Sequence, residues 1–138
     1  MIEIRRLGPG DEDVVRALAE DDAPDATRLL ADDRTFYVAA LDDALPVGFV
    51  FAQELLRRHG DSTMLLVYDV EVAEDYRRRG VGTRLMHELD AIARERAIRT
   101  GFVLTNAAND AAMAFYESLG GTRPNDDDVM WDFDYKAG

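Results

Sequence analysis

The chain has 138 residues, of which 47% are hydrophobic and 32% charged, and its formal net charge is -12. This length and hydrophobic content suit one compact domain, so we expect a single domain over residues 1–138. The chain contains no cysteine, which excludes disulfide scaffolds, thiolate zinc sites and cysteine nucleophiles. Its two histidines, His59 and His87, lack the usual partners of a structural zinc site, and we expect no metal.

The acidic balance bears on partners and location. The 28 Asp and Glu residues outnumber the 16 Lys and Arg residues, and a field of this sign repels phosphate backbones, so we expect no nucleic-acid partner. The apolar runs are shorter than the ~20 residues that span a bilayer, and residues 1–5 contain no apolar core of a secretion signal. We therefore expect a cytoplasmic protein without a membrane partner. We expect the global charge to reflect mainly a salt-adapted or compositionally biased source, so the functional prediction rests on local clusters of residues.

The first half of the chain reads as strands with two short helices near its start. Alternating or β-branched runs predict strands at residues 2–7, 35–41, 47–56 and 62–72. The turn at residues 42–46 joins the second and third of these strands as a hairpin. Helices are predicted behind Asp11 and at about residues 25–30, where an acidic first turn and a proline mark the two starts.

The second half changes to helical spacing. Val81, Leu85, Leu89 and Ile92 recur at intervals of three and four, which predicts a helix over residues 82–96 with one buried face. The remaining predicted elements are a short buried strand at 102–105, a helix from Asn109 or Asp110 to Leu119, and a closing strand at 129–135. A strand–helix–strand unit requires a parallel pair, whereas hairpins are antiparallel. We therefore predict an α/β fold with a mixed sheet of six or seven strands and helices on both faces.

The segment that carries chemistry lies between the longest strand and the following helix. It reads Arg77-Arg78-Arg79-Gly80-Val81-Gly82-Thr83 and is the one strongly basic patch of an acidic chain. Glycines allow a close approach of the backbone, and the first N–H groups of a helix point at its positive end, so a pyrophosphate fits there. The spacing matches neither the P-loop nor the dinucleotide fingerprint. The alternative is a glycine-rich helix start without a ligand.

Two motifs together resemble one family. Val72 followed by Arg77-x-x-Gly80-x-Gly82 resembles the acetyl-CoA-binding motif of the GNAT acetyltransferases, and the segment from Asn109 to Gly120 resembles that family's N-x-x-A-x-x-x-Y-x-x-x-G helix. The resemblance covers the whole chain. It implies a GNAT-like fold with a splay between the fourth and fifth strands that admits acetyl-CoA, and direct acetyl transfer to an amine in a ternary complex.

The resemblance also implies which residues bind the co-substrate. Backbone N–H groups of residues 78–83 would bind the pyrophosphate, and the edge of the strand at residues 70–72 would pair with the pantetheine amides. The implied acetyl-CoA-binding residues are Val70, Val72, Arg77, Arg78, Arg79, Gly80, Val81, Gly82, Thr83, Asn109 and Ala112.

Three residues are candidates for proton transfer. Tyr116 matches the family's acid that protonates the leaving thiolate, although it also lies on an apolar helical stripe and could be a core aromatic. Asp69 and Glu71 interrupt an otherwise apolar strand and share a face by the period of two, unless a bulge intervenes. One could act as the base and the other could bind the substrate ammonium. The alternatives are an ordered water as base and a pair of merely exposed carboxylates.

The substrate expected is a polycationic amine. The Tyr68-Asp69 pair, the arginine loop and the segment 109–120 are similar to the small aminoglycoside 3-N-acetyltransferases, which implies the 3-amino group of an aminoglycoside; Glu71 departs from that pattern. Asp126, Asp127, Asp128 and Asp134 would add an anionic rim that attracts such a substrate, unless they only form a solvated loop. Acetylation of a polyamine or a protein amino group, and a non-catalytic acyl-CoA-binding module, remain as alternatives. The short helices and the hairpin suit a homodimer.

Overall fold

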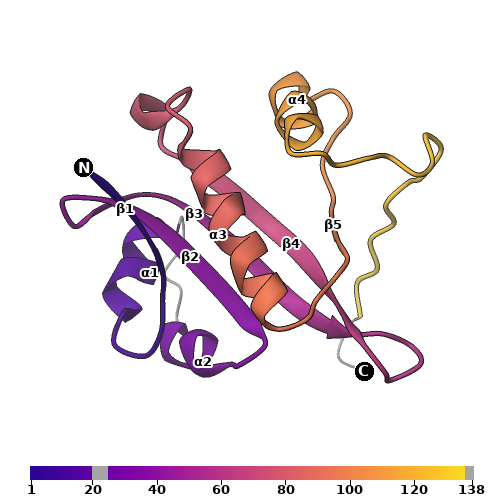
Figure 1. Ribbon diagram of the computed structural model, residues 1–138, viewed down its shortest axis with the longest axis horizontal. Helices are drawn as coiled ribbons and strands as arrows, with labels where there is room; N and C mark the ends of the chain where they lie inside the picture. Colours follow the sequence, from indigo (N-terminus) through magenta and orange to yellow (C-terminus); the bar gives the residue numbers. More distant parts are fainter. Residues whose placement is uncertain (20–24, 136–138) are drawn as a thin grey trace. The chain divides into compact units, whose positions relative to one another are not determined.

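The computed structural model describes residues 1–19 and 25–135. The chain forms two compact units, residues 1–104 and 105–138, which we describe separately. In the first unit the elements are β1 (Ile2–Arg6), α1 (Glu12–Leu18), α2 (Ala26–Ala31), β2 (Thr35–Asp42), β3 (Leu45–Leu56), β4 (Thr63–Val72), the short 3-10 helix η1 (Glu74–Tyr76), α3 (Val81–Glu95) and β5 (Gly101–Val103). The second unit contains α4 (Asp110–Ser118) (Figure 1).

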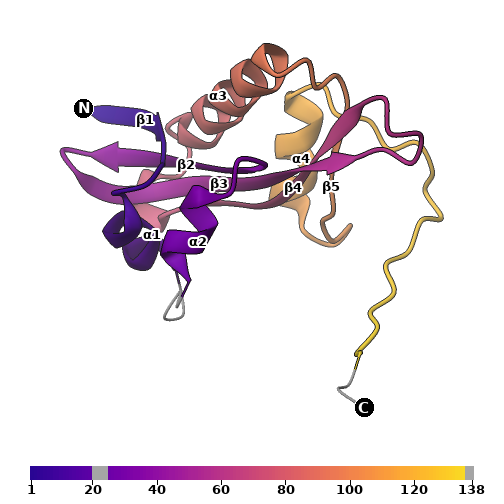
Figure 2. The same ribbon diagram turned by 90° about the horizontal axis from the view of Figure 1, so that it is seen from below.

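The five strands form one mixed sheet in the order β1-β2-β3-β4-β5. The first three neighbouring pairs are antiparallel, and β5 runs parallel to β4 because α3 carries the chain back across the sheet. Helix α3 covers one face, and α1 and α2 cover the other (Figure 2). The mixed α/β architecture with helices on both faces is therefore confirmed.

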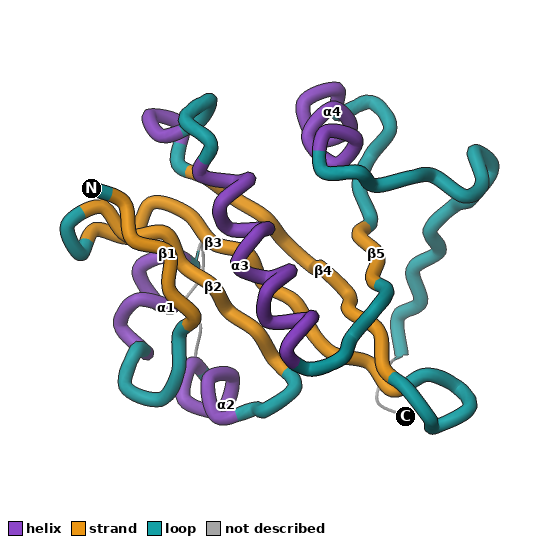
Figure 3. Tube along the Cα trace, in the orientation of Figure 1, coloured by secondary structure: helices purple, strands orange, loops and turns teal. Residues whose placement is uncertain are grey.

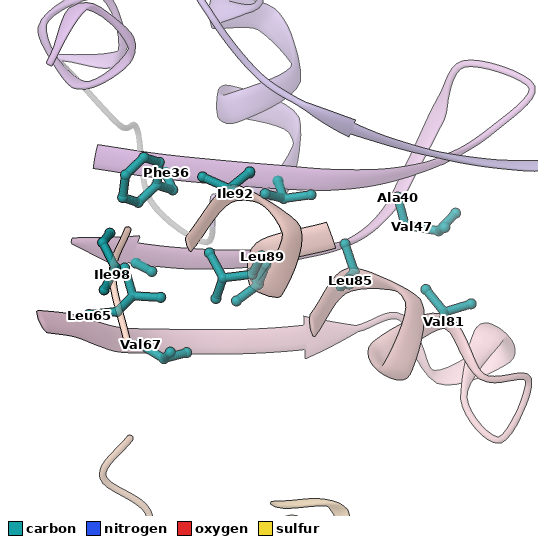
Figure 4. Packing of buried hydrophobic residues seen from close by; sticks show 13 residues of the cluster. Phe36, Ala40, Val47, Leu65, Val67, Val81, Leu85, Leu89, Ile92 and Ile98 are labelled. Carbon is teal, nitrogen blue, oxygen red and sulfur yellow. The ribbon is translucent and has the colours of Figure 1, made fainter. Parts of the chain in front are cut away.

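Each face of the sheet carries its own core. The α3 cluster is built on Val81, Leu85, Leu89 and Ile92, the buried stripe of α3, which packs on inward side chains of β2, β3 and β4 (Figure 4). The α1–α2 cluster holds Val15 and Leu30 against the opposite face of β2 and β3. Because both faces are covered, β2 is buried along nearly its whole length.

Two expectations about the sheet are wrong. Residues 129–135 belong to no strand, so the described residues contain five strands rather than six or seven (Figure 3). Alternation marks a segment that is able to pair, but a strand exists only where a hydrogen-bonded neighbour is present, and the described sheet supplies none for this segment. The strand expected to be buried at 102–105 is the three-residue β5, which lies at the edge of the described sheet and in which Phe102 is exposed.

Within the described residues, none of the helices has both the length and the apolar character needed to cross a bilayer.

Candidate active site

A bulge in β4 sets the direction of its acidic side chains. Phe51 of β3 pairs with Asp69, whereas its neighbour Ala52 pairs with Val67, so Tyr68 is an extra residue in this ladder. An inserted residue shifts the alternation of the strand by one position. Without it, Asp69 would lie on the same face as Val67, in the α3 cluster.

The bulge instead turns both carboxylates to the face that α1 and α2 cover. The β4 side chains that pack in or against the α3 cluster are Leu65, Val67, Val70 and Val72. Asp69 and Glu71 lie opposite Phe51 and Phe49, which belong to the α1–α2 cluster, and both carboxylates are exposed. The two acidic residues therefore share one face, with their side chains in solvent and an aromatic surface beside them.

That aromatic surface consists of four rings in contact. The Tyr37 centroid lies 5.3 Å from that of Phe49 and 5.5 Å from that of Phe51, and Phe51 stacks on Tyr68 at 5.7 Å. Tyr37 is buried, whereas Tyr68 is half exposed. The stack thus leads from the core to a ring that is open to solvent beside Asp69.

The pKa of the Tyr37 hydroxyl is affected by the two carboxylates on this face of β4. Burial, and to a smaller extent the negative charges of Glu71 and Asp69, together raise the pKa of Tyr37 to about 12. The phenol therefore stays protonated at neutral pH, next to two carboxylates whose field favours a cation. Tyr37 and Phe51 are not among the site residues predicted from the sequence. The alternation of side chains along the hairpin strand does place Phe49 and Phe51 on one face, and this pattern could have predicted an aromatic surface there.

The arginine loop ends in a helix start of the kind that binds anions. Gly80 is the N-cap of α3 with φ at 76°, and a Cβ on it would meet nothing within 4 Å. Among the described residues no side chain caps this end of α3, and the first α-helical bond of the helix runs from the Arg84 N–H to the Gly80 carbonyl. The N–H groups of residues 81–83 thus have no partner within the helix. This open helix start fits a pyrophosphate.

Arg77 and Arg79 of the loop each contact a neighbouring segment, and Arg78 has an unusual backbone conformation. The Arg77 Nε donates to the Val72 carbonyl at 2.9 Å, and the Arg79 guanidinium lies 5.1 Å from the centre of the Tyr76 ring. Arg78 takes the left-handed conformation with φ at 64°. The loop therefore folds back on the end of β4 and on η1.

The edge of β4 is open beside this loop. β5 pairs only with residues 65–67, so from Tyr68 onward β4 has no neighbour on that side in the described sheet. The Ala73 N–H donates to Val47 in β3, and in an antiparallel pair the backbone groups of alternate residues point to opposite sides. Val70 and Val72 therefore direct their backbone groups away from β3. This divergence of β4 and β5 agrees with the expected splay.

The other predicted residues lie in the second unit, which we describe by itself. The Asn109 side chain accepts from the Ala112 N–H at 3.0 Å and so caps α4. Tyr116 lies on α4 with its ring 5.3 Å from that of Phe115. The acidic residues expected at a substrate rim are exposed: Asp126, Asp127, Asp128 and Asp134. Asp126 also pairs with Arg123 at 3.8 Å.

Comparison with known proteins identifies the family. The profile of the acetyltransferase (GNAT) family matches residues 5–121, which is most of the chain. The chain belongs to this family. The GNAT profile covers the bulged strand, the arginine loop and α4 together.

Relatives within the GNAT family differ in what they act on. A probable N-acetyltransferase, camello, of Xenopus laevis is 32% identical over 92 residues, which cover 67% of this chain and 40% of that protein. The ribosomal protein bS18 alanine N-acetyltransferase of Escherichia coli K12 is 37% identical over 54 residues, or 39% of this chain and 36% of that one. The chain thus spans about two fifths of the length of these relatives.

A solved structure shares the fold over nearly the full length of the chain. An aminoglycoside acetyltransferase from an uncultured soil metagenomic sample, in complex with trehalose, superposes with a TM-score of 0.88 at 21% identity and covers 98% of this chain and 97% of its own. At this identity the likeness shows the fold alone.

Proposed function

We propose that this GNAT protein is an acyltransferase that moves the acetyl group of acetyl-CoA to an amine. One observation carries the proposal: the end of β4 combines an open backbone edge, a helix start suited to a pyrophosphate and two carboxylates on the adjacent face. The donor and the acceptor of an acetyl transfer need these features side by side. A single domain over residues 1–138 is part of the proposal.

The donor would bind along β4 and the arginine loop. The N–H groups of residues 78–83 would hold the pyrophosphate with the arginines as counter-charges, and the backbone of Val70 and Val72 would pair with the pantetheine amides as an added strand does. The Val72 carbonyl already accepts from Arg77, so the Val70 backbone and the Val72 N–H are the groups available for this pairing.

The chemistry would use the face of β4 that carries Asp69 and Glu71, beside this edge. The amine nitrogen forms a bond to the thioester carbonyl carbon as the carbon–sulfur bond breaks, so the amine must lose a proton and the sulfur must gain one. Asp69 or Glu71, directly or through a water, would accept the first proton, and the Tyr116 hydroxyl would supply the second. Asn109 and Ala112, which form the start of α4, would contribute to the binding of acetyl-CoA.

The acceptor we propose is an aminoglycoside amine, the 3-amino group in particular. The support is the Tyr68-Asp69 pair, in which a half-exposed aromatic ring adjoins an exposed carboxylate. Cations bind favourably over aromatic faces and near carboxylates, and a sugar ring presents an apolar face to an aromatic one. The structural relative from soil that shares this fold is itself an aminoglycoside acetyltransferase, which makes an aminoglycoside the first acceptor to test. Asp126 to Asp128 and Asp134 would steer the polycation to the site.

A protein amino group is the second candidate acceptor. The observation that favours it is the 37% identity over 54 residues to the acetyltransferase that acts on an alanine of ribosomal protein bS18. An N-terminal ammonium would meet the same carboxylates, Asp69 and Glu71, as an aminoglycoside amine.

The test is the release of free thiol from acetyl-CoA with three acceptors: an aminoglycoside, a linear polyamine and a peptide with an N-terminal alanine. We expect the aminoglycoside to give the highest kcat/KM. Asp69→Asn should lower kcat by about 10²–10⁴-fold if this carboxylate is the base. The matched control is Asp90→Asn on the exposed side of α3, which removes the same charge and only a surface ion pair with Arg94. Binding of acetyl-CoA without thiol release to any acceptor would establish a non-catalytic module instead.

A further inference from the structure

A hydrogen bond joins the arginine loop to a distant hairpin. The Tyr76 hydroxyl, at the end of η1, donates to Asp42 Oδ2 at 2.5 Å. Asp42 is the last residue of β2 and begins the tight turn to β3, in which Asp43 and Ala44 both have positive φ. This bond spans 34 residues of sequence. It ties the segment that leads into the arginine loop to the turn of the β2–β3 hairpin.

The Asp42 carboxyl in this bond is ionised and the Tyr76 phenol is neutral. The hydrogen bond from Tyr76 holds the pKa of the Asp42 carboxyl below its usual range, and the same bond raises the pKa of the Tyr76 phenol. At neutral pH a neutral phenol therefore donates to a carboxylate, which is a charge-assisted bond. Asp42 Oδ1 also lies 3.5 Å from the amino group of Met1.

The Tyr76 ring also contacts Arg79 of the arginine loop. The Arg79 guanidinium stacks over this ring at 5.1 Å, directly before Gly80, the N-cap of α3. Ala73 holds the other end of η1, since its carbonyl accepts from the Tyr76 N–H and its N–H donates to Val47 of β3. The Tyr76 side chain thus has its hydroxyl fixed by Asp42 and its face covered by Arg79.

We propose that Tyr76 and Asp42 are positioning residues that hold the arginine loop, and Arg79 above all, in the conformation that accepts the pyrophosphate of acetyl-CoA. This rests on the proposed function, because it assigns a task to residues around the proposed donor site. Neither residue touches the reacting atoms. Their loss should therefore weaken recognition of the diphosphate part of the donor and leave the acetyl transfer step unchanged.

The experiment compares two acetyl donors. S-acetyl-pantetheine carries the thioester without the pyrophosphate, so a loop defect should affect only acetyl-CoA. Tyr76→Phe removes the hydroxyl and keeps the ring under Arg79. We expect it to raise the KM for acetyl-CoA about tenfold, the usual effect of a lost hydrogen bond to a charged group, with kcat and the KM for S-acetyl-pantetheine unchanged. Calorimetric titration with CoA should show the same loss of affinity.

Four variants separate positioning from folding. Asp42→Ala should reproduce the effect of Tyr76→Phe, and the double variant should show no further loss, because the two residues form one bond. Asp42→Asn keeps an acceptor oxygen and should restore most of the affinity. Asp43→Asn is the control: it removes the same charge from the same turn and also adjoins the Met1 amino group, but is not bonded to Tyr76. It should leave both donors unaffected.

The results that would overturn the inference are distinct from those that would overturn the proposed function. If the parent protein binds CoA and transfers acetyl groups, but Tyr76→Phe and Asp42→Ala match the parent with acetyl-CoA, the positioning role is wrong and the function stands. A KM that rises equally for both donors would also contradict it, since that pattern indicates general damage. If the parent binds no CoA, the donor site and the positioning role both fail.

Discussion

Gly48 permits the close approach of β3 to the end of β4, and adding a side chain there should disturb both stability and donor binding. Gly48 lies opposite Val72 in the β3–β4 ladder. A Cβ at this position would meet the Glu71 carbonyl oxygen at 2.9 Å and the Val72 Cα at 3.4 Å. These are backbone atoms, which cannot rotate away as the tip of a side chain can. In Gly48→Ala the end of β4 therefore has to shift by a few tenths of an ångström.

The expected cost follows from that geometry. Forcing an extra carbon into a packed region lowers the free energy of unfolding by about 1–3 kcal/mol. With a urea m-value of about 1–3 kcal/mol/M, the unfolding midpoint should fall by roughly 1 M. Because the displaced segment carries the backbone of Val72 and the Glu71 side chain, we expect the KM for acetyl-CoA to rise as well, at a temperature where the variant is fully folded.

The matched control is Gly8→Ala. A Cβ at Gly8 would meet nothing within 4 Å, and Gly8 is not among the glycines with positive φ. Its free energy of unfolding should stay within about 0.5 kcal/mol of the parent value, or rise slightly because the unfolded chain loses freedom. If Gly48→Ala unfolds at the same urea concentration as Gly8→Ala and binds acetyl-CoA like the parent, the close packing at the end of β4 has no energetic importance.

Three further predictions concern the core, an internal ion pair and the second unit. Leu85→Ala should lower the free energy of unfolding by about 2–5 kcal/mol, because this fully buried side chain joins α3 to the sheet; a loss below 1 kcal/mol in urea unfolding would contradict the packing described. Glu54 has a side chain only 9% exposed. Burial raises the pKa of this carboxyl, but the hydrogen bonds from Thr63 and Arg96, together with the positive charges of Arg96 and Arg34, lower its pKa overall. Because the pKa is lowered, the ionised Glu54 stabilises the protein at pH values above its unfolded-state pKa, and this stabilisation is lost as the pH falls through the folded-state pKa. Glu54→Gln should therefore lower the free energy of unfolding by about 1–3 kcal/mol at pH 7 and by less at pH 3. An equal loss at both pH values in thermal unfolding would refute the pairing. Tyr116→Phe should lower kcat by about 10²–10⁴-fold with little change in stability, and an unchanged kcat would make this residue a core aromatic only.

The elements that could be predicted are those whose signal is local. The stripe from Val81 to Ile92 predicts α3 because residues three and four apart share a helix face whatever surrounds the helix. Likewise, the arginine loop and its glycines predict an open helix start, and Asn109 predicts the cap of α4, because these features depend on a few consecutive residues. The family resemblance rests on the same local motifs, and the GNAT profile confirms it.

The features that could not be predicted depend on which segments become neighbours. Alternation alone places Asp69 and Glu71 on one face but does not say which. That choice was made by the extra residue Tyr68 in the register with β3. The expected closing strand at residues 129–135 failed for a related reason, since its alternating pattern carries no information about a pairing partner.

The sequence by itself determined that this chain builds a strand, a basic glycine-containing loop and an amphipathic helix in succession, because such elements follow from spacing along the chain. The tertiary structure decided which face of the sheet receives the carboxylates, which rings surround them, and that Tyr76 is bonded to Asp42. The physical reason is that a side chain's direction and partners in a sheet are set by the register between strands. The register depends on the packing of both faces at once, and a one-residue shift reverses every side chain beyond it.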